Sequence, residues 1–191
     1  DGSWRQRFFT DGSPAPFWGK QIDQVGSVLW GYGHHYSLTD DEGFIRKIWP
    51  SLDAGANHLS VNIQENGLPA VSFDPWEDTY GQGTYSAAAV CGGLKAAADI
   101  AGSLGEKEKS GYWLKNSERV REAILKYQWS DRRNSFIRGV NHKVHQDHYN
   151  HILHTGGKAY TTKDPTGLYL THWAGEDGRI DAALLGLVFP F

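Results

Sequence analysis

Apolar residues recur at every third or fourth position in several stretches of the chain, which is the spacing of a helix that buries one face. Helical pairs joined by long connections fit an all-helical toroid better than a compact bundle, whose connections are usually short. We therefore predict an all-α fold. The first stripe, in residues 21–38, consists of Ile22, Val25, Leu29, Tyr32 and Tyr36, and further helices are predicted from Thr39 to Leu59, over 85–104, over 107–129 and from Ile180 to Val188.

Residues that start or interrupt helices set the expected boundaries. Thr39 is followed three positions later by Glu42, which is the pattern of a capping box at the start of the second helix. Pro50 lies inside that helix and should kink or split it. Residues 135–140 suggest a short strand. Residues 141–178 are rich in polar side chains and glycine, so we expect them to be mostly irregular.

Three carboxylates and an indole gather in a short segment before the helix over 85–104. Asp74, Glu77 and Asp78 lie within five positions of one another, and Trp76 stands between them. Pro75 is excluded from a helix interior and favours an extended backbone at the residue before it. The carboxylates are therefore expected on a loop, where functional side chains are common.

This acidic segment suits acid catalysis. A carboxyl group beside an indole loses solvation, which disfavours its charged form and raises its pKa. A glutamic acid tuned in this way can hold a proton near neutral pH and give it to a leaving oxygen. The alternative is a solvated acidic loop with one buried tryptophan, because perturbed carboxylates are often structural.

A second cluster of polar side chains falls at the expected start of the first helix. Trp18, Lys20, Gln21 and Asp23 offer an aromatic platform, a cation, an amide and a carboxylate within six positions. Such a set can hydrogen-bond several sugar hydroxyls. The alternative is that Asp23 caps the helix and that the tryptophan is buried.

Five histidines recur at every third position, and two histidines three apart can share one helix face and bind a metal. A strict three-residue step drifts around a helix, however, so all five rings cannot converge. No His-Glu-x-x-His motif is present. We expect solvated or sugar-contacting histidines, no metal and no cofactor. The five are His142, His145, His148, His151 and His154.

The composition excludes some classes of protein. The chain has 191 residues, enough for one domain with a sizeable core, and a formal net charge of −3. No basic surface, apolar run of transmembrane length or signal-peptide pattern is evident, so we expect neither nucleic acid nor a membrane as partner. The compartment stays open. Aromatic residues make up 13%, with eight tryptophans, which suits a carbohydrate-handling surface or a core rich in aromatic rings.

The two ends suggest a larger protein. The chain begins at Asp1 without a methionine and closes with an apolar run from Leu184 to Phe191. An apolar run at a terminus needs something to cover it. We expect residues 1–191 to form a single segment of a larger catalytic domain, with the rest of the same polypeptide as its partner.

Three motifs resemble glycoside hydrolase family 15, the glucoamylase family. The segment Phe-Asp-Pro-Trp-Glu-Asp at 73–78, with Gly81 and Thr-Tyr-Ser at 84–86, resembles the Asp-Leu-Trp-Glu-Glu signature of that family. The segment Trp-Gly-Lys-Gln-Ile-Asp at 18–23 resembles its Trp-Gly-(Arg/Lys)-x-Gln-x-Asp motif, one residue shorter. Residues 178–185, Gly-Arg-Ile-Asp-Ala-Ala-Leu-Leu, resemble the start of a later helix of the family.

The resemblance implies part of an (α/α)6 barrel that hydrolyses α-glucosidic bonds from non-reducing ends with inversion and without a metal. It places the general acid at Glu77, with Asp74 and Asp78 in support. Pro75 and Asp78 depart from the usual leucine and second glutamate, and the general base of the family is expected beyond Phe191. The substrate contacts that it implies are Trp18, Lys20, Gln21, Asp23, Trp76 and, more weakly, Arg179.

Two other functions remain open from the sequence. A helical-toroid disaccharide phosphorylase would require phosphate for turnover. A non-catalytic carbohydrate-binding or structural module would bind sugar without Glu77 and would never turn it over.

Overall fold

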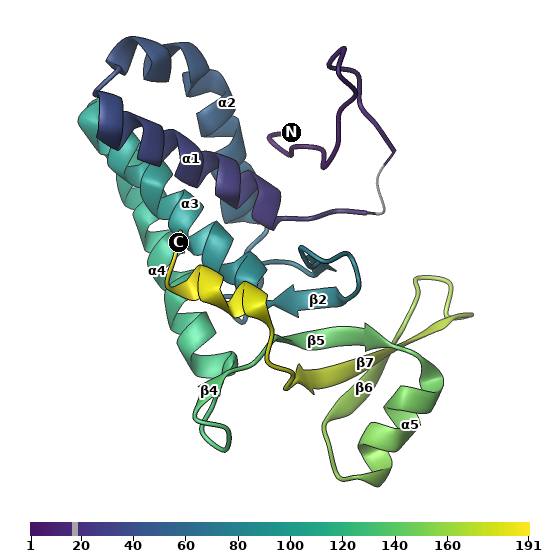
Figure 1. Cartoon of the computed structure of the whole chain (residues 1–191). Coiled ribbons are helices and arrows are strands. Elements are labelled where there is room, and N and C mark those ends of the chain that lie inside the picture. The colour runs from purple at the N-terminus through teal and green to yellow at the C-terminus, as the bar shows by residue number, and fades with distance from the viewer. Residues whose placement is uncertain (17–18) are drawn as a thin grey trace.

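The computed structural model describes residues 1–16 and 19–191 of the chain (Figure 1). Four long helices stand together at one side, and a sheet with a further short helix extends from their lower end. We call the four helices the helical layer. They are α1 (Asp23–Thr39), α2 (Glu42–Val61), α3 (Thr84–Ser103) and α4 (Lys107–Tyr127).

The four helices confirm the predicted ones to within a few residues, but the predicted capping box at Thr39 was wrong. The N-cap of α2 is Asp41, whose side chain accepts a hydrogen bond from the Phe44 backbone N–H at 2.9 Å. Thr39 instead closes α1, where its hydroxyl donates to the His35 carbonyl oxygen. Pro50 lies inside α2 without splitting it.

The core of the helical layer is mainly aliphatic, and its side chains are shielded from solvent. Leu29 of α1, Leu52 of α2, Leu94 of α3 and Val120 of α4 are all fully buried in one cluster. Trp113 joins them, and its indole N–H donates to Asn57. Burial of these side chains supplies most of the driving force for this part of the fold.

Helices α1 and α3 cross at very short range because each has a glycine at the crossing. A Cβ atom on Gly26 would lie 2.3 Å from the Ala89 carbonyl oxygen, and one on Gly93 would lie 2.5 Å from the Gly26 carbonyl oxygen. Larger residues would push the two helices apart. This crossing holds the start of α1 beside the start of α3, where the acidic segment ends.

A five-stranded antiparallel sheet makes up the other half of the molecule, in the order β1-β2-β5-β7-β6. The prediction of an all-α fold was therefore wrong, and the chain is a mixed α and β structure. The strands are β1 (Ser72–Phe73), β2 (Tyr80–Gly83), β5 (Gly139–Val144), β6 (Ala159–Lys163) and β7 (Leu170–Asp177), while β3 (Trp129–Ser130) and β4 (Ser135–Phe136) form a separate hairpin.

The sheet was missed because its strands lack an apolar face. Four of the five residues of β6 are exposed, so no alternation of apolar and polar positions marks it. Residues 141–178, expected to be irregular, hold most of β5, all of β6 and β7, and the short helix α5 (Gln146–His154). The α-helix expected over 180–188 is a 3-10 helix, η1 (Ala182–Leu187).

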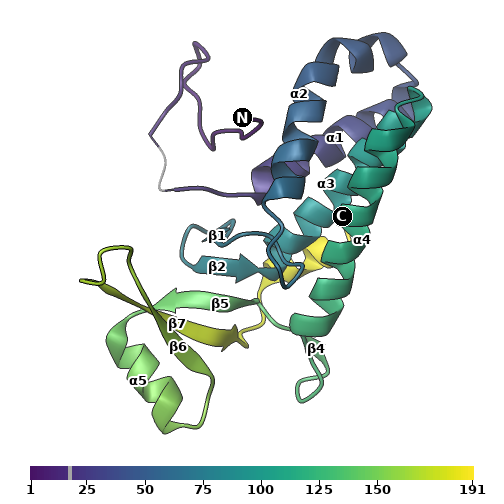
Figure 2. The ribbon, with the colours of Figure 1, turned by 180° about the vertical axis from the view of Figure 1, so that it is seen from behind.

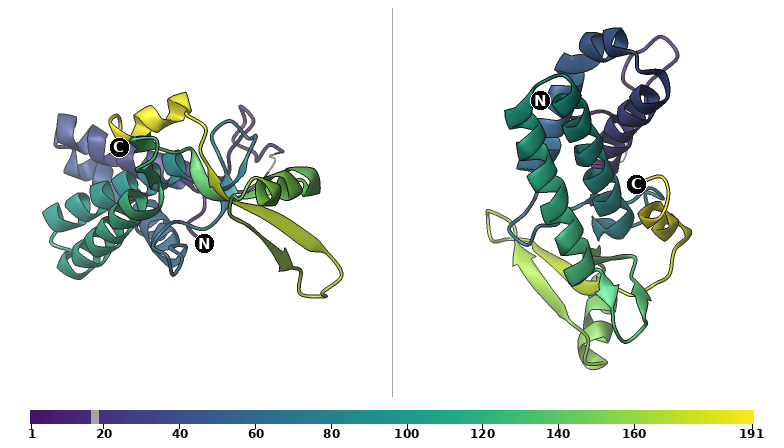
Figure 3. Two further views of the ribbon diagram at one scale, coloured as in Figure 1. Left: turned by 90° about the horizontal axis from the view of Figure 1, so that it is seen from below. Right: turned by 90° about the vertical axis from the view of Figure 1, so that its left-hand side faces the viewer.

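Three arrangements position the candidate site. Residues 1–16 run beside α2, where Trp4 packs on Gly55 (Figure 2). The sheet and α5 project away from the helical layer (Figure 3). Strand β2 passes directly into α3, and the Thr84 hydroxyl at the junction donates to the Ile137 carbonyl oxygen at 2.7 Å. In the part of the chain that the structure describes, no helix is long and apolar enough to cross a membrane.

Candidate active site

The acidic segment is the turn of a hairpin between β1 and β2, and we call it the acid hairpin (residues 72–83). Ser72 pairs with Gly81 and Phe73 pairs with Tyr80, so residues 74–79 form the connecting loop. Within the loop, the Asp74 N–H donates to the Thr79 carbonyl oxygen. The loop thus lies just ahead of α3, as expected from Pro75.

Asp74 holds the acid hairpin together. Its Oδ1 accepts the backbone N–H groups of Asp78 and Thr79 at 3.0 and 3.2 Å. Its Oδ2 accepts a short hydrogen bond from Arg138 Nη2. Both side chains of this ion pair are less than one-tenth exposed. A buried carboxylate with this many donors is a structural centre, because each partner would be costly to remove.

Arg138 binds two further carboxylates, one from the acid hairpin and one from outside it. Its Nη2 also contacts Asp78 Oδ1 at 2.7 Å, and its Nε lies 3.1 Å from Asp181 Oδ2. Asp181 comes from the segment before η1 and is nearly buried. Three segments far apart in sequence therefore meet on one buried guanidinium, whose fixed fork of donors suits several carboxylates at once.

Glu77 stands at the tip of the acid hairpin. Its backbone has φ of +59°, a conformation that residues other than glycine adopt at a cost and that is enriched at functional sites. Its side chain is 23% exposed, so a ligand can reach it. Both carboxylate oxygens lie 2.7 Å from Arg7 Nη2.

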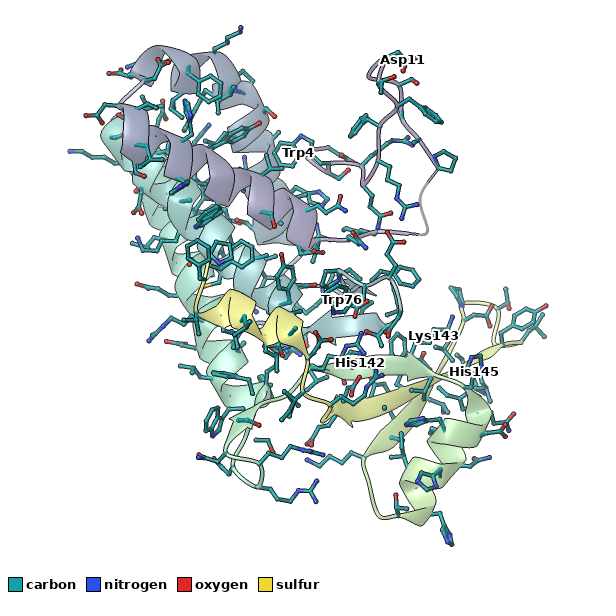
Figure 4. The ribbon with its side chains drawn as sticks, viewed as in Figure 1. Trp4, Asp11, Trp76, His142, Lys143 and His145 are labelled. Carbon is teal, nitrogen blue, oxygen red and sulfur yellow. The ribbon has the colours of Figure 1, made fainter. Side chains whose placement is uncertain are left out.

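Trp76 lies beside the same tip but turns its indole toward η1. The indole N–H donates to Asp181 Oδ1 at 2.9 Å and to Oδ2 at 3.1 Å, while 57% of the residue stays exposed. Figure 4 shows Trp76 next to strand β2. The expected desolvation of a carboxyl group by this indole therefore involves Asp181 at least as directly as Glu77.

Two residues of the predicted sugar-binding cluster reach Asp74 from the start of α1. The Gln21 side-chain amide donates to the Asp74 carbonyl oxygen at 3.0 Å. Asp23 is buried in the first turn of α1, and its Oδ1 has no hydrogen-bond partner within the described residues. Burial raises the pKa of Asp23 to about 6, and the nearby charge of Asp74 acts in the same direction.

The remaining predicted contacts lie further out. Lys20 Nζ donates to Asn62 Oδ1 at 2.9 Å, and the Lys20 carbonyl accepts the Phe73 N–H. Partial burial lowers the pKa of the Lys20 ammonium group. Arg179 is paired with Asp177. Trp18 falls outside the described residues.

The five histidines do not form a metal site. His142 lies on β5, His145 caps α5, and the other three lie on α5, and no group of ligands suited to a metal occurs among residues 1–16 and 19–191. His142 is only 3% exposed, so it is not the solvated histidine that we expected. Burial lowers the pKa of His142, which favours the neutral ring.

Behind the hairpin, a groove of about 930 Å³ opens between β5, β7 and α5. Asp78, His142 and Arg179 line it together with His145 and His148. Arg179 thus shares a surface with Asp78 but not with Glu77.

Sequence reasoning did not single out Arg138, Arg7 or Asp181 as site residues, although Asp181 lies in the segment 178–185 that resembles a helix start of family 15. Arg138 follows two apolar residues in a short strand-like segment, a pattern that marks burial but not function. A buried arginine must be paired with carboxylates. That rule points to the acidic segment only once both are known to be buried.

One known protein is similar to this chain in sequence. No protein-family model matches the chain. The chain is 31% identical over 141 residues to a protein of Methanocaldococcus jannaschii named "Uncharacterized glycosyl hydrolase MJ1610". The chain thus has a glycosyl hydrolase-like homologue. The match takes in 74% of this chain and 22% of the relative, so the chain spans about a fifth of that protein's length.

Two solved structures share the fold at low sequence identity. A rhamnosidase from Klebsiella oxytoca with rhamnose bound is 16% identical, with a TM-score of 0.56, over 72% of this chain and 28% of that one. A GH78 family rhamnosidase of Bacillus sp. GL1 is also 16% identical, with a TM-score of 0.50, over 59% of this chain and 12% of that one. These comparisons support a glycoside hydrolase-like fold and do not support family 15 in particular.

Proposed function

We propose that the protein hydrolyses α-glucosidic bonds from the non-reducing ends of α-glucans or oligosaccharides with inversion, and that this chain supplies the general acid, Glu77. The observation that carries the proposal is the acid hairpin. A buried network of Asp74 and Arg138 fixes its loop, while the carboxyl group at its tip is partly exposed and is paired only with the half-exposed Arg7 among the interactions described. The similarity to a named glycosyl hydrolase supports the same class of reaction.

In the proposed reaction, Glu77 gives its proton to the glycosidic oxygen as the bond from that oxygen to the anomeric carbon breaks. A water attacks the anomeric carbon from the opposite face and loses its proton to a carboxylate base. In inverting enzymes the two carboxyl groups lie about 6.5 to 9.5 Å apart to leave room for that water. We place the base outside residues 1–191.

Arg7 must leave Glu77 for this step. Its Nη2 contacts both carboxylate oxygens and occupies the position that a glycosidic oxygen would need. Arg7 is about half exposed and belongs to an irregular segment, so a substrate can displace it. Proton transfer requires the acid within about 2.6 to 3.2 Å of the leaving oxygen.

The other residues are assigned supporting roles. Asp74 and Asp78 keep the hairpin in shape through Arg138, and Trp76 forms a wall of the site. Gln21 holds the backbone of Asp74, and Asp23 lies buried beside it. Lys20, Trp18 and Arg179 are proposed as substrate contacts further from the acid.

The experiment that tests the acid is Glu77→Gln in the polypeptide that contains this chain. Glutamine keeps the size of the side chain and removes the transferable proton, so we expect turnover to fall about 10²- to 10⁴-fold. Glu122→Gln, on the exposed face of α4, is the control and should turn over normally. Asp23→Asn should retain turnover, and its selective loss would move the acid to Asp23.

Time-resolved proton NMR with maltose, isomaltose and trehalose follows the same samples, beside an α-rhamnoside. Release of β-glucose first supports inversion, whereas α-glucose first contradicts it. Turnover of the rhamnoside alone would contradict the proposed substrate. Turnover by residues 1–191 alone would place the base inside the chain, among Asp147, Glu176, Asp177 and Asp181.

A further inference from the structure

Four aromatic rings form a continuous row across the sheet, starting at the base of the acid hairpin. Phe73 of β1 meets Tyr80 of β2 at 5.2 Å between ring centroids, and Tyr80 meets Trp173 of β7 at 6.5 Å. Trp173 then stacks with Tyr160 of β6 at 6.2 Å, with the two planes only 12° apart. Phe73 and Tyr80 directly flank the acid loop, so the row begins next to the segment that carries Glu77.

The outer part of the row lies on the face of the sheet away from α5. Trp173 stands opposite both Lys143 and Tyr160 in the strand register, so these three side chains share one face. His172 is the neighbour of Trp173 in sequence and points to the other face, where it packs on Tyr149 of α5 at 4.9 Å. Helix α5 therefore covers the face opposite the row (Figure 3).

Hydrogen bonds at the ring edges fix the orientation of the two outermost rings. The Trp173 indole N–H donates to Thr162 Oγ1 at 2.8 Å, and the Tyr160 hydroxyl donates to Asn141 Oδ1 at 3.1 Å. Tyr160 remains 41% exposed and Trp173 is partly exposed. The rings are thus held in place while part of their surface stays open to solvent.

The chemistry beside the row suits a sugar chain better than an apolar partner. Asn141, Lys143 and Thr162 put an amide, an ammonium and a hydroxyl group next to the rings. A flat ring with polar groups at its edge matches a saccharide, which has an apolar C–H face and hydroxyl groups around its rim. An apolar protein segment or a lipid would cover the exposed Lys143 ammonium group without pairing it.

We propose that the last three rings of this row, Tyr80, Trp173 and Tyr160, bind the leaving-group side of an α-linked oligoglucoside whose scissile bond lies at Glu77. The general acid protonates the leaving oxygen, so the sugars on that side of the bond extend from the acid. The row begins at the acid hairpin and runs away from it. The position of the scissile bond rests on the proposed function, whereas sugar binding by the row does not.

Direct titration tests the binding. Maltoheptaose is titrated into this chain and followed by NMR or calorimetry, with Trp173→Ala and Tyr160→Ala as the disrupting variants. Each variant removes one stacking ring, and we expect binding about tenfold weaker for each. Trp129→Ala, which removes a ring from the separate β3–β4 hairpin, is the control and should bind like the unmodified chain.

The variants also report on folding, because the row could instead only join the strands. Melting curves are recorded for each variant. Should Trp173→Ala unfold, the test rests on Tyr160→Ala, because Tyr160 lies on the edge strand of the sheet. A Tyr160→Ala chain that melts normally and binds tenfold more weakly supports the proposal. Equal affinity of all variants, or no binding of maltoheptaose to the unmodified chain, overturns it.

A second measurement separates this proposal from the proposed function. In the polypeptide that contains this chain, Trp173→Ala should lower kcat/KM for maltoheptaose about tenfold and leave maltose nearly unchanged. Loss of binding on Trp173→Ala, with turnover unaffected by Glu77→Gln, would overturn the assignment of the acid alone. Loss of turnover on Glu77→Gln, with maltoheptaose unaffected by Trp173→Ala, would overturn the binding row alone.

Discussion

The helical layer and the acid hairpin are stabilised by different forces. The helical layer buries aliphatic side chains such as Leu29 and Leu94 in a dry core. The acid hairpin is fixed by charges, with Asp74, Asp78 and Asp181 converging on Arg138. Apolar burial tolerates many sequences that keep volume and pattern, whereas a buried ion network depends on each of its members. Changes in the two regions should therefore have different consequences.

The sharpest test of this difference is Arg138→Ala. It leaves the buried Asp74 carboxylate without its cation, which typically costs about 3 to 5 kcal/mol. We expect the loss to concentrate in the acid hairpin, where the Asp78 and Thr79 amide protons should exchange faster. Hydrogen exchange together with urea unfolding measures both effects.

The control for that experiment removes both charges. Asp74→Asn combined with Arg138→Met removes the most deeply buried pair of charges, while Asp181 keeps its hydrogen bond from the Trp76 indole, so the double variant should recover part of the lost stability. If the double variant is as unstable as Arg138→Ala, the ion pair is not what holds the hairpin.

Leu94→Ala probes the other region. Removing a fully buried leucine from α3 leaves a cavity and should cost about 2 to 5 kcal/mol. The loss should appear as a lower urea midpoint for the whole chain, since all four helices share the core. Leu38→Ala, on an exposed position of α1, should change stability by less than about 0.5 kcal/mol. Selective loosening of the hairpin by Leu94→Ala would contradict the division.

Asp23 lies where the two regions meet, and its stability effect depends on pH. Its folded pKa of about 6 is above the ordinary aspartate value of 3.8, so the folded state binds its proton more tightly than the unfolded state. Stability from this group is complete below about pH 4 and is lost as the pH rises toward 6. A shift of about two pKa units corresponds to roughly 2 to 3 kcal/mol.

Asp23→Asn should therefore stabilise the chain at pH 7 by up to that amount and have little effect at pH 4. Melting temperatures at the two pH values check this. Asp99→Asn, an exposed position on α3, should show no such pH-dependent gain. An equal effect of Asp23→Asn at both pH values would contradict the buried, unpaired carboxyl group.

Trp76→Phe is expected to have the smallest effect. It removes the indole hydrogen bonds to Asp181, but Trp76 is mostly exposed, so we expect a loss of about 1 kcal/mol or less. A double-mutant cycle with Asp181→Asn isolates the contact, and a coupling energy near zero would show that it contributes nothing.

What the sequence could predict follows the same division. The spacing of apolar residues predicts helices α1 to α4, because each helix buries one face. Strand β6 does not, because nearly all its residues are exposed, and the polar run from 141 to 178 therefore looked irregular. The acidic segment could be located from Pro75 and its neighbours. The ion pair between Asp74 and Arg138, however, joins positions 64 residues apart, and no local pattern encodes that contact.

The direct passage of β2 into α3 limits how the chain can change in length. An extra residue between Gly83 and Thr84 would turn α3 by about 100° relative to the sheet. An extra residue within β2 would swap the two sides of the strand. Insertions should therefore be tolerated at the hairpin tip near Glu77 and rejected at its base. Natural or engineered variation in which substrates reach the acid is thus expected to arise at the tip, as changes of loop length, with the helical layer left intact.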